Sequence, residues 1–221
     1  MSKLILHPLF LFGLALRLAL LLLLQPWAET QWYLPFLAHG FESPSFDPWT
    51  QFLEDGGDPA AFPYGLMMLG VFLPLSSMAH LLGLPLHFAY AGTLLLADLG
   101  MLLALRHLHP GHDRTLLIWY WLSPIVILAT YWLGLNDLIP VLLLTLALLS
   151  AQRTHLFAAG ALCGAAVSAK FSMVLALPFF LIYLLQNKAL RWALPAYVKG
   201  LAASSSVLLV PFALSAGGLH M

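Results

Sequence analysis

This sequence has little charge and almost no cysteine. Only 8% of its 221 residues are charged, whereas 62% are hydrophobic and the mean hydropathy is +0.92. Soluble domains carry about 25% charged and about 45–50% apolar residues, so the composition excludes a water-soluble globule. Lys and Arg together number nine, as do Asp and Glu, so no net charge attracts nucleic acid. The single cysteine, Cys163, excludes an internal disulfide and does not indicate a compartment.

Long apolar runs occupy most of the chain. A transmembrane helix needs about 20 predominantly apolar residues, and 221 residues could hold at most about ten of them. The runs lie at 4–25, 63–82, 85–105, 116–134, 138–151, 155–169, 171–187 and 193–215. They predict an all-α, polytopic membrane protein in which residues 1–221 form a single membrane domain.

The one long polar segment, roughly 26–62, is rich in acidic residues and contains no Lys or Arg. Loops rich in Lys and Arg stay in the cytoplasm, so this segment is expected to face the opposite side, with Lys3 holding the N-terminus inside. The other basic clusters fall at Arg106/Arg114, Arg153 and Lys188/Arg191.

These clusters all reach the cytoplasm only if two of the apolar runs are not simple spans. The run 63–82 would be broken or re-entrant, as its prolines favour, and 155–187 would be divided at Lys170. A single helix over 155–187 would be about 48 Å long, against an apolar core of about 30 Å. We therefore predict seven spans and an extracytoplasmic segment over 26–84 that contains the broken run.

Two charged residues fall near the middle of predicted spans. Arg17 lies in the first crossing and Asp98 in the second. Charge inside a bilayer is costly and is usually paired, so a structural Arg17–Asp98 ion pair is predicted. The alternative is that Arg17 contacts an anionic lipid headgroup.

Three further residues lie at predicted outer ends of spans. Lys170 could reach lipid headgroups as a snorkelling side chain, or it could meet a substrate phosphate. Asn136 and Asp137 follow Gly134 in a short outer turn, which such residues form without any further function. Their predicted position on the acidic side keeps a role at an active site open.

Asp47 precedes a short segment with the pattern of a capped helix, Pro48-Trp-Thr-Gln-Phe-Leu-Glu54, and two glycines follow at 56 and 57. Asp at the N-cap and proline at the first helical position predict a helix that lies at the membrane interface. The cap explains Asp47 without catalysis. A carboxylate at the mouth of the membrane is also well placed as a general base.

The nine histidines show no ligand spacing typical of a structural zinc site. His107, His109 and His112 cluster, but in the basic loop that is predicted to be cytoplasmic. A metal on that face is not expected.

The order of these features resembles a known family. An Arg-bearing first helix is followed by Asp47-Pro-Trp-Thr-Gln-Phe-Leu-Glu-Asp-Gly-Gly-Asp-Pro, by Phe62-Pro-Tyr-Gly-Leu-Met and by Ala97-Asp98-Leu-Gly-Met. Trp119-Tyr-Trp-Leu-Ser-Pro124, Gly134-Leu-Asn136-Asp137 and Ala169-Lys170-Phe171 complete the series. The whole chain is similar to the N-terminal membrane module of GT-C glycosyltransferases. The nearest pattern is that of the catalytic subunit of GPI mannosyltransferase I and its prokaryotic relatives.

The resemblance implies roles for individual residues. Asp47 matches the catalytic aspartate of the first outer loop, and Lys170 matches a lysine near the donor phosphate. Asn136 and Asp137 match the outer loop that borders the active site, where Tyr64 and Glu54 are also placed. The eukaryotic relative has two acidic residues spaced by one where this chain has Ser45-Phe46-Asp47. No cofactor is therefore predicted, and a divalent metal remains an open alternative.

The function implied is transfer of a sugar from a polyprenyl-phosphate-linked donor at the extracytoplasmic face of a prokaryotic plasma membrane. The alternative is a non-catalytic membrane subunit of a larger complex that retains the GT-C scaffold. The expected partners are the lipid-linked donor, membrane lipids and a second membrane subunit that supplies or replaces the C-terminal half of such an enzyme. Nucleic acid is not an expected partner.

Overall fold

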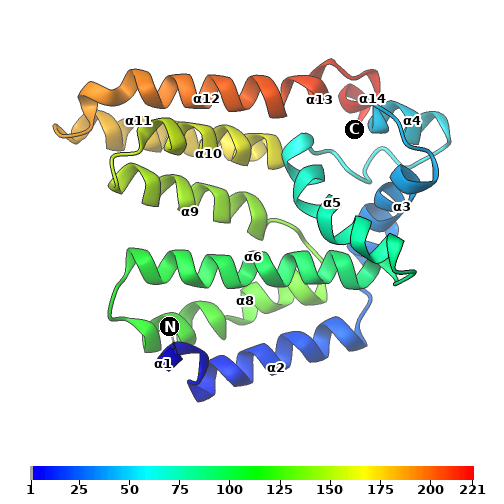
Figure 1. Cartoon of the computed structure of the whole chain (residues 1–221), viewed down its shortest axis with the longest axis horizontal. Helices are drawn as coiled ribbons and strands as arrows, with labels where there is room; N and C mark the ends of the chain where they lie inside the picture. The colour runs from blue at the N-terminus through cyan, green and yellow to red at the C-terminus, as the bar shows by residue number, and fades with distance from the viewer. Residues whose placement is uncertain (1) are drawn as a thin grey trace. The chain divides into compact units, whose positions relative to one another are not determined.

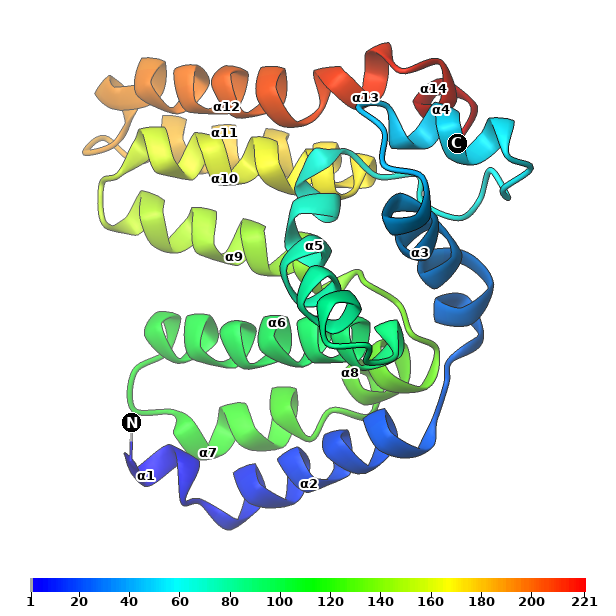
Figure 2. The same ribbon diagram turned by 45° about the vertical axis from the view of Figure 1, so that its right-hand side comes forward.

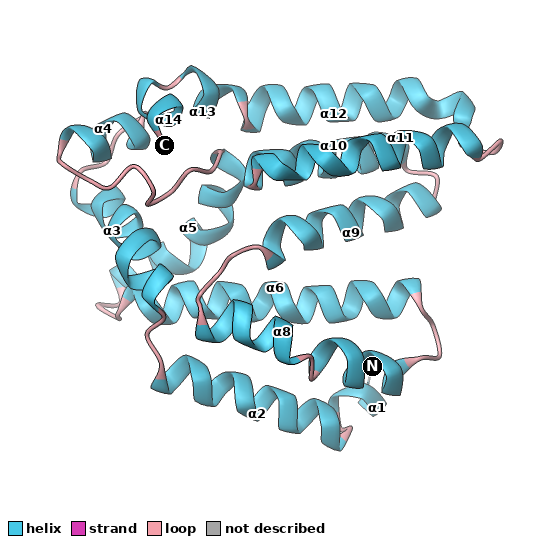
Figure 3. Ribbon diagram, turned by 180° about the vertical axis from the view of Figure 1, so that it is seen from behind, coloured by secondary structure: helices cyan, strands magenta, loops and turns pink. Residues whose placement is uncertain are grey.

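A computed structural model describes residues 2–221 and, from Leu4 onward, their side chains. The predicted all-α class is confirmed, because the described residues form helices joined by short loops and contain no strand (Figure 3). The chain divides into two compact units. The first unit comprises Met1–Glu42 and Phe72–Leu138, and the second comprises Ser43–Val71 and Ile139–Met221. The prediction of a single membrane domain over 1–221 stays a prediction.

The first unit is built around three antiparallel helical elements. Its elements are α1 (Ser2–Ile5), α2 (Pro8–Leu23), the π-helix η1 (Glu29–Tyr33), α3 (Leu34–Glu42), α6 (Leu86–Leu108), α7 (Asp113–Leu116), the π-helix η2 (Leu117–Trp121), α8 (Pro124–Ile127) and the π-helix η3 (Leu128–Trp132). Contacts between Arg17 and Asp98, and between the Leu21 carbonyl and His87, show that α2 and α6 run in opposite directions. Bonds from Arg106 to Asp113 and from Tyr90 to Gly134 show that residues 113–132 run back along α6.

The second unit is a layered set of helices whose tightest contact joins α10 and α12 (Figures 1 and 2). Its elements are α4 (Pro48–Glu54), α9 (Leu138–Gln152), α10 (Leu156–Ala169), the 3-10 helix η4 (Phe171–Ala176), α11 (Leu177–Gln186), the 3-10 helix η5 (Arg191–Ala193), α12 (Leu194–Leu208), α13 (Val210–Leu214) and α14 (Ala216–His220). The chain passes between the units at three points, one of which falls within α5 (Leu66–Leu81) and another at the start of α9.

Glycines allow α10 and α12 to pack backbone against backbone. A Cβ at Gly160 would collide with the Tyr197 carbonyl oxygen, and a Cβ at Gly200 would collide with the Phe157 carbonyl oxygen. Small residues that allow such close approach are typical of helix–helix contacts in membranes, where the hydrophobic effect does not drive helices together. Gly164 faces Leu201 in the same manner, so the two helices run parallel.

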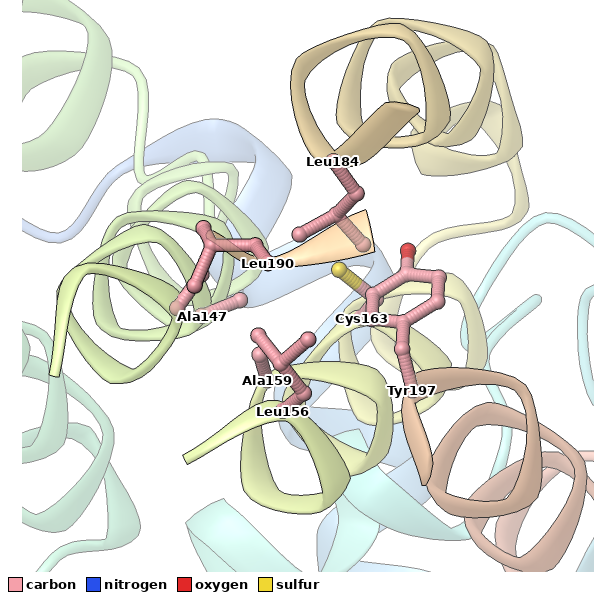
Figure 4. Close-up of a cluster of buried hydrophobic side chains, with 8 residues drawn as sticks. Ala147, Leu156, Ala159, Cys163, Leu184, Leu190 and Tyr197 are labelled. Atoms are coloured by element: carbon pink, nitrogen blue, oxygen red, sulfur yellow. The ribbon is translucent and has the colours of Figure 1, made fainter. Parts of the chain in front are cut away.

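The core beside this contact contains the single cysteine. Cys163 is buried with Tyr197, Leu184 and small residues of α9 and α10, as Figure 4 shows. Cys163 is therefore a packing residue in the described structure.

Among residues 2–221, fewer helices are long enough to cross a bilayer than the seven that the sequence predicts. By length and composition, α6 qualifies with 23 residues, and 113–132 qualifies as a pair of helices bent by 47°. The other apolar helices have 10–17 residues. A 16-residue helix such as α2 is about 24 Å long at about 1.5 Å per residue, and non-helical residues follow it at 24–26.

Within 26–84 the structure confirms one expectation, corrects another and adds a helix that the sequence did not predict. The short helix α4 begins after Asp47, as predicted. The polar segment, for which only the helix after Asp47 was predicted, also contains continuous helix from Glu29 to Glu42. The run 63–82 was predicted to be broken or re-entrant. The break is wrong, since α5 is continuous through Pro74, and a proline inside a helix can remove one hydrogen bond without ending the helix. The re-entrant arrangement stays a prediction.

The predicted division at Lys170 is confirmed. The helix α10 ends at Ala169, and Lys170 has extended backbone angles before η4 begins. Residues 155–187 therefore form two helical segments instead of one helix.

Candidate functional site

Asp47 is the centre of a hydrogen-bond network in the second unit. As the predicted N-cap of α4, its Oδ1 accepts from the Thr50 N–H at 3.2 Å, while Oδ2 accepts from the Thr50 hydroxyl at 2.8 Å. The Ser215 hydroxyl donates to Oδ1 at 2.7 Å. Asp47 thus both caps α4 and binds the segment that leads into α14.

These bonds change the acidity of Asp47. Partial burial acts to raise the pKa of its carboxyl, but hydrogen bonds from Ser215 and Thr50 outweigh burial and hold the pKa below its usual value. The carboxylate is therefore ionised at neutral pH and is a weaker base than an unperturbed one.

The C-terminal segment completes this network. The Gly217 N–H donates to the Thr50 hydroxyl at 2.8 Å, and the Gly218 N–H donates to the Ser215 hydroxyl at 2.9 Å. A Cβ at Gly217 would collide with the backbone of α4 at Thr50. Sequence reasoning missed these partners, since Ser215 lies 168 positions from Asp47 and neither it nor the two glycines carry a motif.

Lys170 lies at the break between α10 and η4, and its side chain is half-buried. The loop that carries Tyr64 is attached just before this break. The Gly65 N–H donates to the Ser168 carbonyl at 2.8 Å, and the Ser168 hydroxyl donates to the Leu208 carbonyl at 2.7 Å. Lys170 and the Tyr64 loop therefore lie at the end of α12.

Four of the predicted site residues thus belong to one end of the second unit. Asp47 is joined through Ser215 to the segment that follows α12, and Lys170 lies beside the end of α12 itself. Tyr64 is buried and packs edge to face against Phe62 at 5.1 Å, while Glu54 is exposed at the end of α4. Figure 1 shows α4, α13, α14 and the ends of α10 and α12 on the same side.

Asn136 and Asp137 belong to the first unit. They lie in a turn between η3 and α9, as predicted, and Gly134 has the positive φ of 73° that such a turn requires. Asn136 is 1% exposed, and its Nδ2 has no hydrogen-bond partner among the described residues. Asp137 is half-buried.

The ion pair predicted between Arg17 and Asp98 is present. Arg17 Nε lies 2.6 Å from Asp98 Oδ2, and both side chains are fully buried. The hydroxyls of Tyr120 and Tyr131 donate to Asp98 at 2.6 and 2.9 Å. The Arg17 guanidinium also lies 3.7 Å from the centroid of a Trp121 ring. Because Arg17 is fully buried, the alternative contact with a lipid headgroup is wrong.

A second buried polar pair, Glu29 and His87, was not anticipated from the sequence. His87 Nδ1 lies 2.7 Å from Glu29 Oε1, and His87 Nε2 lies 2.8 Å from the Leu21 carbonyl oxygen. A carbonyl oxygen can only accept a hydrogen bond, so His87 Nε2 carries a hydrogen and donates it to Leu21. A second proton lies in the hydrogen bond between His87 Nδ1 and Glu29 Oε1. Burial is the main influence on Glu29 and raises the pKa of its carboxyl to about 7, against the lowering effect of His87.

This pair predicts a pH-dependent stability that Glu29→Gln removes. The pKa of Glu29 is about 7 in the folded protein and 4.5 in the unfolded chain. Glu29 therefore contributes its full share to the free energy of unfolding below pH 4.5, and that contribution is lost as the pH rises through about 7. The wild type is expected to lose about 3 kcal/mol across this window, whereas the glutamine side chain carries no titratable proton and can hydrogen-bond to His87 at every pH. Thermal unfolding in a neutral detergent between pH 5 and 9 measures the difference. Glu42→Gln, at an exposed site, is the control, and an equal pH dependence in Glu29→Gln contradicts the assignment.

Among the described residues, no group of three or more His, Cys, Asp or Glu side chains is arranged to hold a metal ion. Comparison with known proteins adds no relative: no family model, curated protein or solved structure matches the chain.

Proposed function

We propose that this chain is a multi-pass membrane protein that transfers a sugar from a polyprenyl-phosphate-linked donor at the extracytoplasmic face. The seven crossings would be α2, α6, residues 113–132, α9, α10, residues 171–186 and α12. Some of these crossings consist of more than one consecutive helical element. Helical residues 171–186 combine η4 with α11, and α13 follows α12 after one residue.

The observation that carries this proposal is the separation of charge between the two ends of the second unit. Because α10 and α12 run parallel, the turns before them lie at one end, and these turns carry Arg153, Lys188 and Arg191. The opposite end carries the acidic residues of α4 and of the loop that follows it: Asp47, Glu54, Asp55 and Asp58. This is the distribution expected of a cytoplasmic end and an extracytoplasmic end.

The chemistry proposed for the acidic end follows from its residues. Lys170 is the one Lys or Arg residue placed there in the described part of the second unit. Its ammonium would stabilise the charge that develops on the leaving polyprenyl phosphate. Asp47 would accept the proton of the attacking acceptor hydroxyl, with Tyr64 and Glu54 bordering the reacting groups.

Cysteine labelling tests the membrane arrangement. Leu84 and His112 are exposed in the loops before and after α6, and the native Cys163 is buried and adds little background. In inside-out and right-side-out vesicles, Leu84→Cys and His112→Cys are expected to react with an impermeant maleimide from opposite faces. Leu84→Cys should react from the extracytoplasmic side. Reaction of both from the same face would overturn the topology and the proposed site.

One observation favours a second candidate, a non-catalytic subunit that retains the GT-C scaffold. Asp47 is engaged by the Thr50 and Ser215 hydroxyls, and its lowered pKa suits a structural carboxylate better than a base. A sugar-transfer assay distinguishes the two candidates. The enzyme would transfer sugar, and transfer would depend on Asp47 and Lys170, whereas the non-catalytic subunit would transfer none.

A further inference from the structure

An aromatic cavity in the first unit lies outside the proposed sugar-transfer residues. It has a volume of about 460 Å³ and is lined by two chain segments, 24–28 with Trp32, and 132–135. Three tryptophans contribute to the lining: Trp27, Trp32 and Trp132. Trp27 and Trp132 are 62% and 56% exposed, which leaves large ring surface open to a ligand.

The tryptophans provide walls at different angles. The rings of Trp27 and Trp32 have centroids 4.7 Å apart and planes inclined by 71°, and Trp132 comes from the second segment. The face of an indole carries negative charge density and attracts a cation within about 6 Å of its centroid. Several indoles around one volume form an aromatic cage.

The backbone around the cavity also favours positive charge. The helix α2 ends at Leu23 and η3 ends at Trp132, and both run toward this end of the unit. The C-terminal end of a helix carries partial negative charge, and its last carbonyls have no partner within the helix. Among the residues that line the cavity, none is charged, and Gln25 has the one side chain that can accept a hydrogen bond.

We propose that this cavity binds the quaternary ammonium headgroup of a choline lipid. A quaternary ammonium has no N–H group to satisfy, so indole faces and helix C-termini are sufficient to hold it. A primary ammonium would need several side-chain hydrogen-bond acceptors, and the lining offers one, that of Gln25, because the indole N–H groups only donate. Leu22 and Leu23, in the last turn of α2, are 67% and 80% exposed and give the acyl chains of such a lipid an apolar surface beside the cavity.

The identification of the ligand as a lipid rests on the membrane arrangement proposed above, whereas the cation cage does not. The experiment therefore uses a free cation and a lipid as separate probes. The full chain is labelled with 5-fluorotryptophan in maltoside micelles, and fluorine resonances are followed by NMR. The probes are choline, its neutral isostere 3,3-dimethylbutanol, and the lysolipids with choline and ethanolamine headgroups.

Choline is expected to shift the resonances of the three cavity tryptophans saturably, while the neutral isostere does not. The choline lysolipid is expected to bind at least about tenfold more tightly than free choline and more tightly than the ethanolamine lysolipid. Trp132→Leu should weaken binding about fivefold to tenfold, and Trp132→Phe less. Trp119→Leu, at a 78% exposed tryptophan of the same unit, should leave binding unchanged.

Equal shifts with choline and its isostere, or no saturable shift, would overturn the cation cage. An effect of Trp119→Leu as large as that of Trp132→Leu would show a general aromatic surface and would also overturn it. Choline binding as tight as lysolipid binding would overturn the lipid as ligand. None of these results bears on sugar transfer, so failure here is distinguishable from failure of the proposed function.

Discussion

Asp98→Ala is expected to lower the free energy of unfolding by about 3–5 kcal/mol, the range for removing one partner of a buried ion pair. The substitution leaves the Arg17 guanidinium buried without a counter-charge, since both side chains are fully buried at a separation of 2.6 Å. It also removes the acceptor of two tyrosine hydroxyls, those of Tyr120 and Tyr131. Reversible unfolding in mixed micelles measures the loss.

The chain offers a matched control for this prediction. Arg106 and Asp113 form an ion pair through two hydrogen bonds, at 2.8 and 3.0 Å, but their side chains are 27% and 33% exposed. Exposed pairs contribute about 0–1 kcal/mol, so Asp113→Ala should cost far less. The double variant Arg17→Met/Asp98→Leu should be more stable than Asp98→Ala, because it removes both charges. Equal losses from Asp98→Ala and Asp113→Ala would contradict the account.

Gly160→Ala is expected to cost about 1–3 kcal/mol, although alanine is the better helix former. The added methyl group would collide with the Tyr197 carbonyl oxygen and force α10 and α12 apart. The helix α10 carries Ser168, and α12 is followed by α13 and Ser215. Moving the two helices apart would therefore also displace the residues that hold the proposed site in place. Unfolding in mixed micelles again gives the measurement.

Gly70→Ala is the same substitution at a helical glycine with open space around it. A Cβ at Gly70 meets no atom within 4 Å, and the residue is exposed in α5. It should be neutral or stabilise the protein by up to about 1 kcal/mol, the difference in helix propensity. If Gly160→Ala and Gly70→Ala gave the same result, close backbone packing between α10 and α12 would not be a source of stability.

The sequence predicted the elements better than their lengths. Hydropathy placed apolar segments within a few residues of α2, α6, α9 and α10, and the charge of Lys170 marked a true helix end. It did not predict that helix would occupy 29–42, where Tyr33 stacks on Tyr90 of α6, a partner far away in the sequence. Nor did the count of prolines predict that α5 stays continuous through Pro74.

Local chemistry could be predicted for the candidate site, and distant partners could not. The N-cap role of Asp47 follows from the residues beside it, and the Arg17–Asp98 pair follows from the cost of charge inside an apolar span. Ser215 and Gly217 meet Asp47 and Thr50 through the fold alone. The Glu29–His87 pair likewise joins residues 58 positions apart with no local signal in either segment.

The central claim is that Asp47 and Lys170 serve a transfer reaction at the acidic end of the second unit. The most direct measurement is transfer of radiolabelled sugar from polyprenyl-phosphate donors by the full chain in nanodiscs, with donor binding recorded in parallel. Wild type should transfer sugar, Asp47→Asn should bind donor without transfer, and Lys170→Met should bind donor about 10-fold to 100-fold more weakly. Asn still caps α4, and Lys199→Met, at an exposed lysine of α12, should behave as wild type. Unchanged donor binding in Lys170→Met together with absence of transfer in the wild type would contradict the claim and favour a non-catalytic subunit.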